Sequence, residues 1–141
     1  MAVNRRTPSR LKTLIAEDDR ASRLLLQTFL SRYGECATAA DGSQAVEAFR
    51  LAVGSSSPFD LICMDILMPR MDGHEAIKQV RAIEAAGGIL PPSGVKIIVT
   101  TALNDMKDVV RAFQGLSDAY LVKPIERTQL LRQMWSLRLF E

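Results

Sequence analysis

Acidic, hydroxyl and lysine side chains stand at the ends of four short apolar segments of this chain. Glu17 and Asp18 follow the first segment, and Asp65 closes another. Thr101 and Lys123 follow the remaining two. Short apolar runs of this kind, often β-branched, are typical of strands buried on both faces. Because the carboxyl ends of parallel strands form the crevice where ligands bind, we expect these side chains to converge on one site.

The chemistry that this site favours is phosphoryl transfer assisted by a divalent cation. Carboxylates such as Glu17, Asp18 and Asp65 repel one another strongly unless a cation lies among them. Mg²⁺ commonly takes one or two carboxylates together with phosphate oxygens. Asp65 could itself accept a phosphoryl group, with Lys123 as the fixed cation that neutralises the charge of transfer. Thr101 adds a hydroxyl group to the same edge.

Five strand-like segments that alternate with five amphipathic helical patterns must position these groups. Strict alternation implies right-handed crossovers and an α/β fold, and five strands favour the flavodoxin-like version. We therefore expect a doubly wound parallel sheet of order 2-1-3-4-5, covered by five helices in three layers. The turn-rich stretch 87–94 is interpreted as a connector on the amino-end side of the sheet rather than a lid. The strands are expected at 13–16, 36–39, 59–64, 95–99 and 119–122.

Length and charge indicate one domain without a strong electrostatic partner. The chain has 141 residues, which predicts a single domain over 12–141 after a basic, poorly ordered tail at 1–11. A net charge of +2 gives no bulk argument for nucleic-acid binding. No run is apolar enough for a signal peptide or membrane insertion. Cys36 and Cys63 lack metal-site spacing and are interpreted as buried hydrophobes in a reducing, cytoplasmic protein.

Several other polar or aromatic residues have a plainer, structural interpretation. Asp19, Asp72 and the pair 104–105 each precede an amphipathic segment, as helix caps do. His74, the only histidine, is interpreted as a surface residue because it has no second ligand nearby in the sequence. Trp135 exceeds what one apolar stripe on the last helix requires. Core packing is favoured for Trp135, with a partner contact at this end of the chain as the alternative.

Four sequence motifs follow one another along the chain with helices between them. They are LIAEDD at 14–19, MDILMPRMDG at 64–73, Thr101-Ala102, and YLVKP at 120–124. In this order they resemble the response-regulator receiver domains of two-component signalling, and the resemblance covers roughly 12–137. The resemblance implies the same fold that the alternation of strands and helices predicts.

The resemblance also implies roles for individual residues. Asp65 would accept a phosphoryl group from a phosphohistidine on a sensor histidine kinase or a histidine phosphotransfer protein. Mg²⁺ would be held by Asp18 and Asp65 directly, by Glu17 through water, and by the backbone carbonyl of Leu67. Lys123 would contact the phosphoryl group.

The switch that the resemblance implies lies at the far edge of the sheet. The Thr101 hydroxyl would move to meet the phosphoryl group, and Tyr120 would change rotamer with it. The surface formed by the fourth helix, fifth strand and fifth helix would then repack for an unknown downstream protein. We expect no output domain after the last helix. Partner binding, onward transfer in a phosphorelay and a homodimer through this surface all stay open.

Two other classes of protein compete with this interpretation. A Mg²⁺-dependent phosphohydrolase of the haloacid dehalogenase type would need a second acid two residues after its nucleophile, and Leu67 stands there instead. We therefore expect a signalling switch that turns over no external substrate. A receiver-like module that binds partners without phosphorylation is the second alternative, and the intact set of Asp65, Thr101 and Lys123 weighs against it.

Overall fold

The computed structural model describes residues 11–90, 93–102, 105–112, 114 and 116–140. Residues 1–10 of the expected basic tail and Asn104, with its expected capping role, lie outside the described residues. Leu11, the last residue assigned to that tail, is instead the buried first residue of a strand. Within the described part of the chain, no helix has the length and apolar character needed to cross a membrane.

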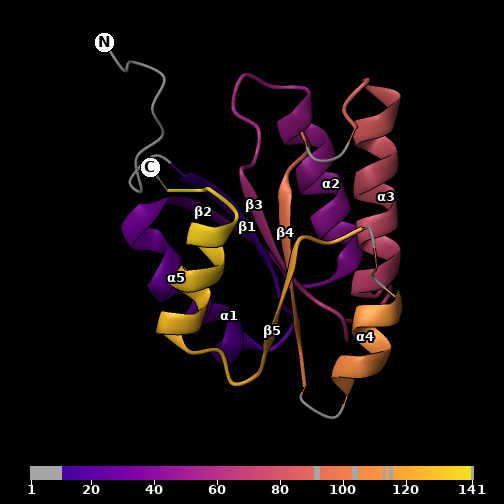
Figure 1. Ribbon diagram of the computed structural model, residues 1–141. Helices are drawn as coiled ribbons and strands as arrows, with labels where there is room; N and C mark the ends of the chain where they lie inside the picture. Colours follow the sequence, from indigo (N-terminus) through magenta and orange to yellow (C-terminus); the bar gives the residue numbers. More distant parts are fainter. Residues whose placement is uncertain (1–10, 91–92, 103–104, 113, 115, 141) are drawn as a thin grey trace.

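A parallel five-stranded sheet forms the centre of the molecule (Figure 1). Its strand order is β2-β1-β3-β4-β5, which confirms the flavodoxin-like arrangement. β3 and β4 run one and two residues further than expected, so each strand includes the polar residue that closes it. The strands are β1 (Leu11–Ala16), β2 (Gly34–Ala39), β3 (Leu61–Asp65), β4 (Lys96–Thr101) and β5 (Ala119–Val122).

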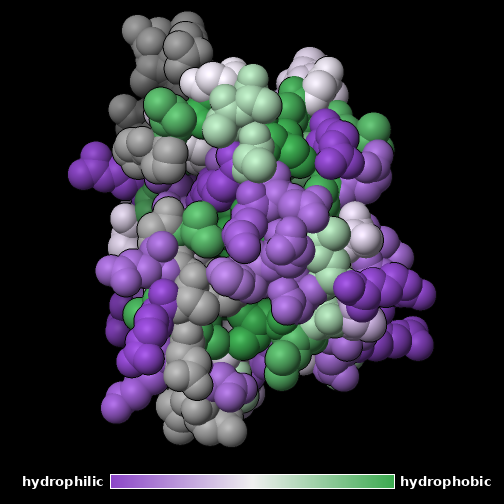
Figure 2. All heavy atoms as spheres, turned by 90° about the vertical axis from the view of Figure 1, so that its right-hand side faces the viewer, coloured by the Kyte–Doolittle hydropathy of each residue, from purple (hydrophilic) through white to green (hydrophobic). Residues whose placement is uncertain are grey.

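Helices cover both faces of the sheet and complete the three expected layers (Figure 1). One apolar cluster packs α2 and α3 against the sheet, and a second packs α1 and α5 against the opposite face. Figure 2 shows that the side of the molecule carrying α3 is mostly hydrophilic. The helices are α1 (Arg20–Leu30), α2 (Gly42–Val53), α3 (Gly73–Ala86), α4 (Met106–Ala112) and α5 (Arg127–Ser136), with a short 3₁₀ turn, η2 (Ser31–Tyr33).

Two of the expected helix caps are present. The Asp19 carboxylate accepts a hydrogen bond from the Ser22 amide at 2.9 Å, at the start of α1. Asp72 accepts one from the Glu75 amide at 2.9 Å, at the start of α3. Each bond satisfies an amide that has no partner within its own helix, which fixes where the helix begins.

The expected core packing of Trp135 is wrong. The Trp135 side chain is 56% exposed, and its ring meets the edge of Phe140 with 5.3 Å between centroids. Leu130 and Met134 form the buried stripe of α5, and Trp135 lies one position beyond it. A helix buries only about a third of its circumference against a sheet, so this neighbouring position faces solvent.

The two cysteines have different environments, which corrects one of the two expectations. Cys63 is buried in β3, and burial raises the pKa of its thiol to about 12. Cys36 is only half-buried, because it lies on β2, a strand at the edge of the sheet. Both are free thiols.

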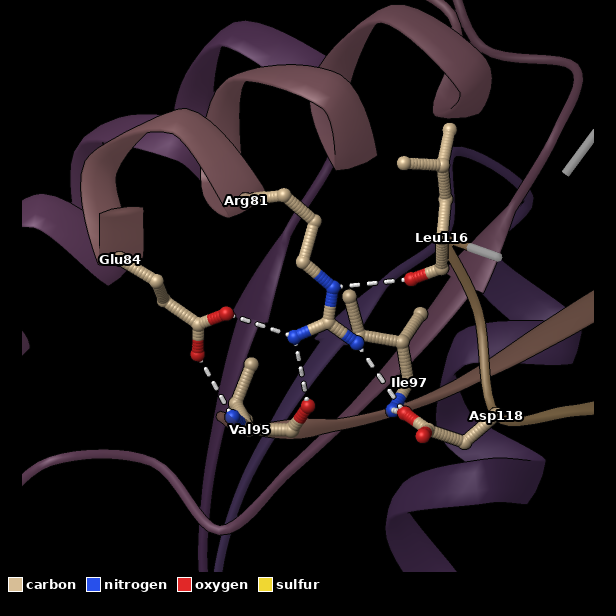
Figure 3. A network of polar contacts seen from close by, with 6 residues as sticks. All are labelled: Arg81, Glu84, Val95, Ile97, Leu116 and Asp118. Carbon is tan, nitrogen blue, oxygen red and sulfur yellow. Dashed lines mark hydrogen bonds and ion pairs between the residues drawn. The ribbon is translucent and has the colours of Figure 1, made fainter. Parts of the chain in front are cut away.

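A network centred on Arg81 ties three segments together at the amino end of the sheet (Figure 3). The Arg81 side chain leaves α3 and donates to the Leu116 carbonyl at 2.9 Å and to the Val95 carbonyl at 2.9 Å. It also pairs with Glu84 at 2.7 Å and with Asp118 at 3.1 Å. The segments before β4 and β5 are thereby fixed to α3. Residues 93–95, the described end of the connector before β4, enter that strand beside this network at its amino end.

Candidate functional site

Three carboxylates converge at the carboxyl ends of β1 and β3. Glu17 and Asp18 directly follow β1, and Asp65 is the last residue of β3. Because β1 and β3 are adjacent parallel strands, their ends meet. One oxygen from each of the three side chains lies within 4.8 Å of the others. Glu17 is 1% exposed and Asp65 is 5% exposed, whereas Asp18 is open to solvent.

Lys123 brings a cation into this cluster from the end of β5. Its Nζ lies 2.8 Å from Glu17 Oε1 and 3.3 Å from Asp65 Oδ1. The Lys123 amide donates to the Thr101 carbonyl at 2.7 Å, and the bond from Lys123 to Pro124 is cis. The ammonium group thus pairs with two of the three carboxylates, and the cluster keeps an excess of negative charge.

This excess shows in the protonation of the site. Burial, and then the neighbouring Glu17 carboxylate, raise the pKa of Asp65 to about 7, although Lys123 acts in the opposite direction. Burial tends to lower the pKa of Lys123, but Glu17 and Asp65 outweigh that effect and raise it. Lys123 therefore stays charged at neutral pH, while Asp65 lies close to its titration midpoint.

The donor set of this cluster fits Mg²⁺. Glu17 Oε1 is buried and accepts no hydrogen bond of good geometry, so the Lys123 ammonium is its nearest counter-charge among the described residues. Asp18, Asp65 and Glu17 offer oxygen atoms close to one another. Mg²⁺ prefers such hard oxygen ligands and keeps several waters, which the exposed side of Asp18 allows.

The hydroxyl groups at the end of β4 have different surroundings. The Thr101 hydroxyl is buried and donates to the Ala102 carbonyl at 3.3 Å, a long contact for a hydroxyl donor. Thr100 precedes it and has a buried hydroxyl without a partner in the described part of the chain. Tyr120, on β5, is half-buried and its hydroxyl lies 3.5 Å from the Val110 carbonyl of α4.

The loop between β3 and α3 carries Leu67, whose side chain is 68% exposed. The Gly73 amide donates to the Ile66 carbonyl at 3.0 Å and closes the base of this loop. A Cβ atom at Gly73 would lie 2.3 Å from the Asp65 carbonyl oxygen. Glycine is therefore required here because the helix start approaches the backbone of the site residue.

Sequence reasoning missed two charged residues beside this loop. Asp41 is 2% exposed and caps α2 by accepting from the Gln44 amide at 2.8 Å. Arg70, in the loop after β3, donates to the second oxygen of Asp41 at 2.8 Å. An aspartate before an amphipathic segment is a helix-start signal, which could have identified Asp41. His74, interpreted as a surface residue, is partly exposed.

Comparison with known proteins agrees with this geometry. Residues 13–134 match the response regulator receiver domain family, and the chain therefore belongs to that family. A probable histidine kinase from Oryza sativa subsp. indica is 34% identical over an alignment of 131 positions, which covers 86% of this chain and 12% of that protein. A probable transcriptional regulator from Cyanophora paradoxa is 33% identical over 127 residues, 89% of this chain and 47% of that protein.

A solved structure with the same fold is the receiver domain of a sensor histidine kinase from Pseudomonas aeruginosa, which has a magnesium ion in its active site cleft. It is 26% identical, has a TM-score of 0.73, and is matched over 92% of this chain and 99% of its own. The chain spans less than half the length of the two curated relatives above. Receiver domains act as signalling switches in two-component systems rather than as metabolic enzymes, and they bind Mg²⁺ in their acidic pocket.

Proposed function

We propose that this chain is a Mg²⁺-dependent phosphoryl acceptor in which Asp65 receives the group from a phosphohistidine. The observation that carries the proposal is the position of Asp65. Its carboxylate is 5% exposed and lies beside two further carboxylates and the Lys123 ammonium, at the carboxyl edge of the sheet. The donor would be a sensor histidine kinase or a histidine phosphotransfer protein, the proteins with which receiver domains interact.

The transfer uses the deprotonated Asp65 carboxylate. One of its oxygens attacks phosphorus, a phosphorus–oxygen bond forms, and the electron pair of the breaking phosphorus–nitrogen bond stays on the donor imidazole. Lys123 Nζ is 3.3 Å from Asp65 Oδ1, close enough to stabilise the negative charge on the phosphoryl oxygens during transfer. When bound, Mg²⁺ would neutralise charge in the acidic cluster and on the incoming group. Glu17, Asp18, Asp65 and the Leu67 carbonyl are the groups that would hold it.

The response to phosphorylation would pass through Thr101 and Tyr120. The long contact of the Thr101 hydroxyl with the Ala102 carbonyl is easily exchanged for a charge-assisted bond to a phosphoryl oxygen. Tyr120 reaches the Val110 carbonyl and so links β5 to α4. Moving such a switch from 1:99 to 99:1 takes roughly 5.5 kcal/mol of differential stabilisation. The repacked α4–β5–α5 surface would then serve partner binding, self-association or onward transfer.

Intact mass after incubation with a small phosphodonor tests this proposal. Wild type is incubated with acetyl phosphate or phosphoramidate, with and without Mg²⁺, beside the Asp65→Asn variant. We expect one added phosphoryl group on wild type with Mg²⁺ and none on the variant or after chelation. Equal addition to both proteins, or no addition from either donor, contradicts the proposal. Steady multiple turnover of a phosphate ester would instead favour the phosphohydrolase alternative.

A further inference from the structure

The ion pair between Arg70 and Asp41 joins an exposed cation to a buried anion. The Arg70 side chain is 73% exposed, yet its guanidinium reaches the Asp41 carboxylate, which is only 3% exposed, at 2.8 Å. Asp41 binds two groups at once, because its other carboxylate oxygen accepts a hydrogen bond from the Gln44 amide at 2.8 Å. An ordinary ion pair at the surface adds little to the free energy of unfolding, whereas removing the partner of a buried carboxylate lowers it strongly.

The backbone at Arg70 adopts a conformation that serves this contact. Its φ angle is 66°, in the left-handed region that side-chain-bearing residues rarely occupy. Within the described residues, Arg138 is the only other non-glycine residue with positive φ. The Met71 amide donates to the Pro69 carbonyl at 2.7 Å, so a three-residue turn closes around Arg70 and accounts for this backbone conformation.

A second contact ties the same loop to the same helix. The Gly42 amide, next to Asp41, donates to the Met71 carbonyl at 3.0 Å. A Cβ atom at Gly42 would lie 2.1 Å from that carbonyl oxygen, so the two backbones touch directly. The loop after Asp65 is therefore fastened to the start of α2 by consecutive residues on both sides.

We propose that Arg70 is a positioning residue for the metal site and acts through Asp41. This inference rests on the proposed function. The loop from Ile66 to Asp72 carries the Leu67 carbonyl. Met68 is buried in the core and the Gly73–Ile66 bond closes the base of the loop, while the two contacts with α2 hold the part around Arg70. Holding the loop in place sets the direction of the Leu67 carbonyl relative to Asp65. Groups that orient a metal ligand in this way typically change metal affinity when they are removed.

The test measures the apparent dissociation constant for Mg²⁺, by calorimetry, and the initial rate of phosphorylation by acetyl phosphate. For Arg70→Ala we expect a dissociation constant about tenfold higher than for wild type. At saturating Mg²⁺ we expect the rate to return to within about twofold of wild type, because Arg70 does not contact the reacting atoms. Arg70→Lys retains a cation that can reach Asp41 and should recover part of the affinity.

A double-mutant cycle separates positioning from a general loss of stability. Asp41→Asn keeps the helix cap, since asparagine caps as well as aspartate, but removes the charge that Arg70 binds. If Arg70 acts through Asp41, the double variant is no weaker for Mg²⁺ than either single variant. Arg50→Ala, which removes an exposed arginine from α2, is the matched control and should leave the affinity unchanged.

Two results would overturn the inference. One is an Arg70→Ala dissociation constant within twofold of wild type, and the other is additive loss in the double variant. Failure of wild type itself to bind Mg²⁺ and accept phosphoryl would instead remove the proposed function. The wild-type measurements therefore distinguish the two failures.

Discussion

Two clusters of buried charge lie at opposite ends of the sheet, and they differ in how completely their charges are satisfied. At the amino end, Arg81 pairs with Glu84 and Asp118. Glu84 also accepts from the Val95 amide at 2.6 Å, and Asp118 accepts from the Ile97 amide at 2.8 Å. Both carboxylates thus have an ionic partner and a backbone donor. Satisfied networks of this kind hold one arrangement of the chain.

The cluster at the carboxyl end is incomplete by comparison. The Lys123 ammonium pairs with Glu17 and Asp65, and Asp18 adds a third carboxylate to the same cluster. The raised pKa of Asp65, about 7, is the direct result of burial and of the unbalanced Glu17 carboxylate. The difference between the two ends shows that burial of charge has two uses. Buried charges that all have partners fix the fold. Buried charges that lack partners can instead bind a cation and a phosphoryl group.

Replacing the central cation of the satisfied cluster should give the largest change in stability. Arg81→Met leaves the buried Glu84 carboxylate and the more accessible Asp118 carboxylate without their ionic partner. Because an unpaired buried carboxylate is costly, we expect the free energy of unfolding to fall by about 3–5 kcal/mol. Arg50→Met is the matched control. Its ion pair with Glu47 is more than half exposed, so about 0–1 kcal/mol is expected. Urea unfolding of both variants measures this difference, and equal effects would show that the Arg81 network is not a stabilising anchor.

Neutralising Asp65 in the incomplete cluster should change the free energy of unfolding by a smaller amount and in the opposite direction. In the absence of divalent cations at pH 8, Asp65→Asn should raise the free energy of unfolding by about 1–2 kcal/mol, since it removes a buried charge and then the repulsion of that charge with Glu17. The folded-state pKa of Asp65 is above its ordinary value of 3.8, so the native state keeps this proton longer than the unfolded chain. The protonated Asp65 therefore makes its full contribution to the free energy of unfolding below about pH 4. This contribution is lost as the pH rises to about 7.

The same urea titrations, repeated at pH 4 and pH 8, check this sign. The gain from Asp65→Asn should be present at pH 8 and nearly absent at pH 4. A variant that is less stable than wild type at pH 8 without metal would mean that the Lys123 ion pair outweighs the repulsion from Glu17.

The sequence predicts the fold and the members of the acidic cluster because both depend on local patterns. Short apolar runs mark the strands, and a site residue that closes a strand is placed by the topology alone. Glu17, Asp65 and Lys123 are of this kind, and the structure brings their side chains together. The caps at Asp19 and Asp72 are equally local, since each bonds an amide three residues away.

The pairings that sequence reasoning missed depend on distance along the chain and on side-chain reach. Arg70 and Asp41 are 29 residues apart, and Arg81 and Asp118 are 37 residues apart. Nothing in either neighbourhood indicates which opposite charge a long arginine side chain will meet. The prediction that Trp135 packs in the core is wrong for another reason. Adjacent positions on α5 face different directions, so Met134 packs on the sheet while Trp135 faces solvent.

The measurement that tests the incomplete neutralisation of the acidic site most directly is a carbon-13 NMR titration of the Asp65 side-chain carboxyl, with and without Mg²⁺. Without the ion we predict a midpoint near pH 7, because Asp65 is buried beside Glu17. With Mg²⁺ the midpoint should fall by several units, since a bound cation favours the charged carboxylate. A midpoint near 4 without the ion, or one that Mg²⁺ does not move, would contradict the account.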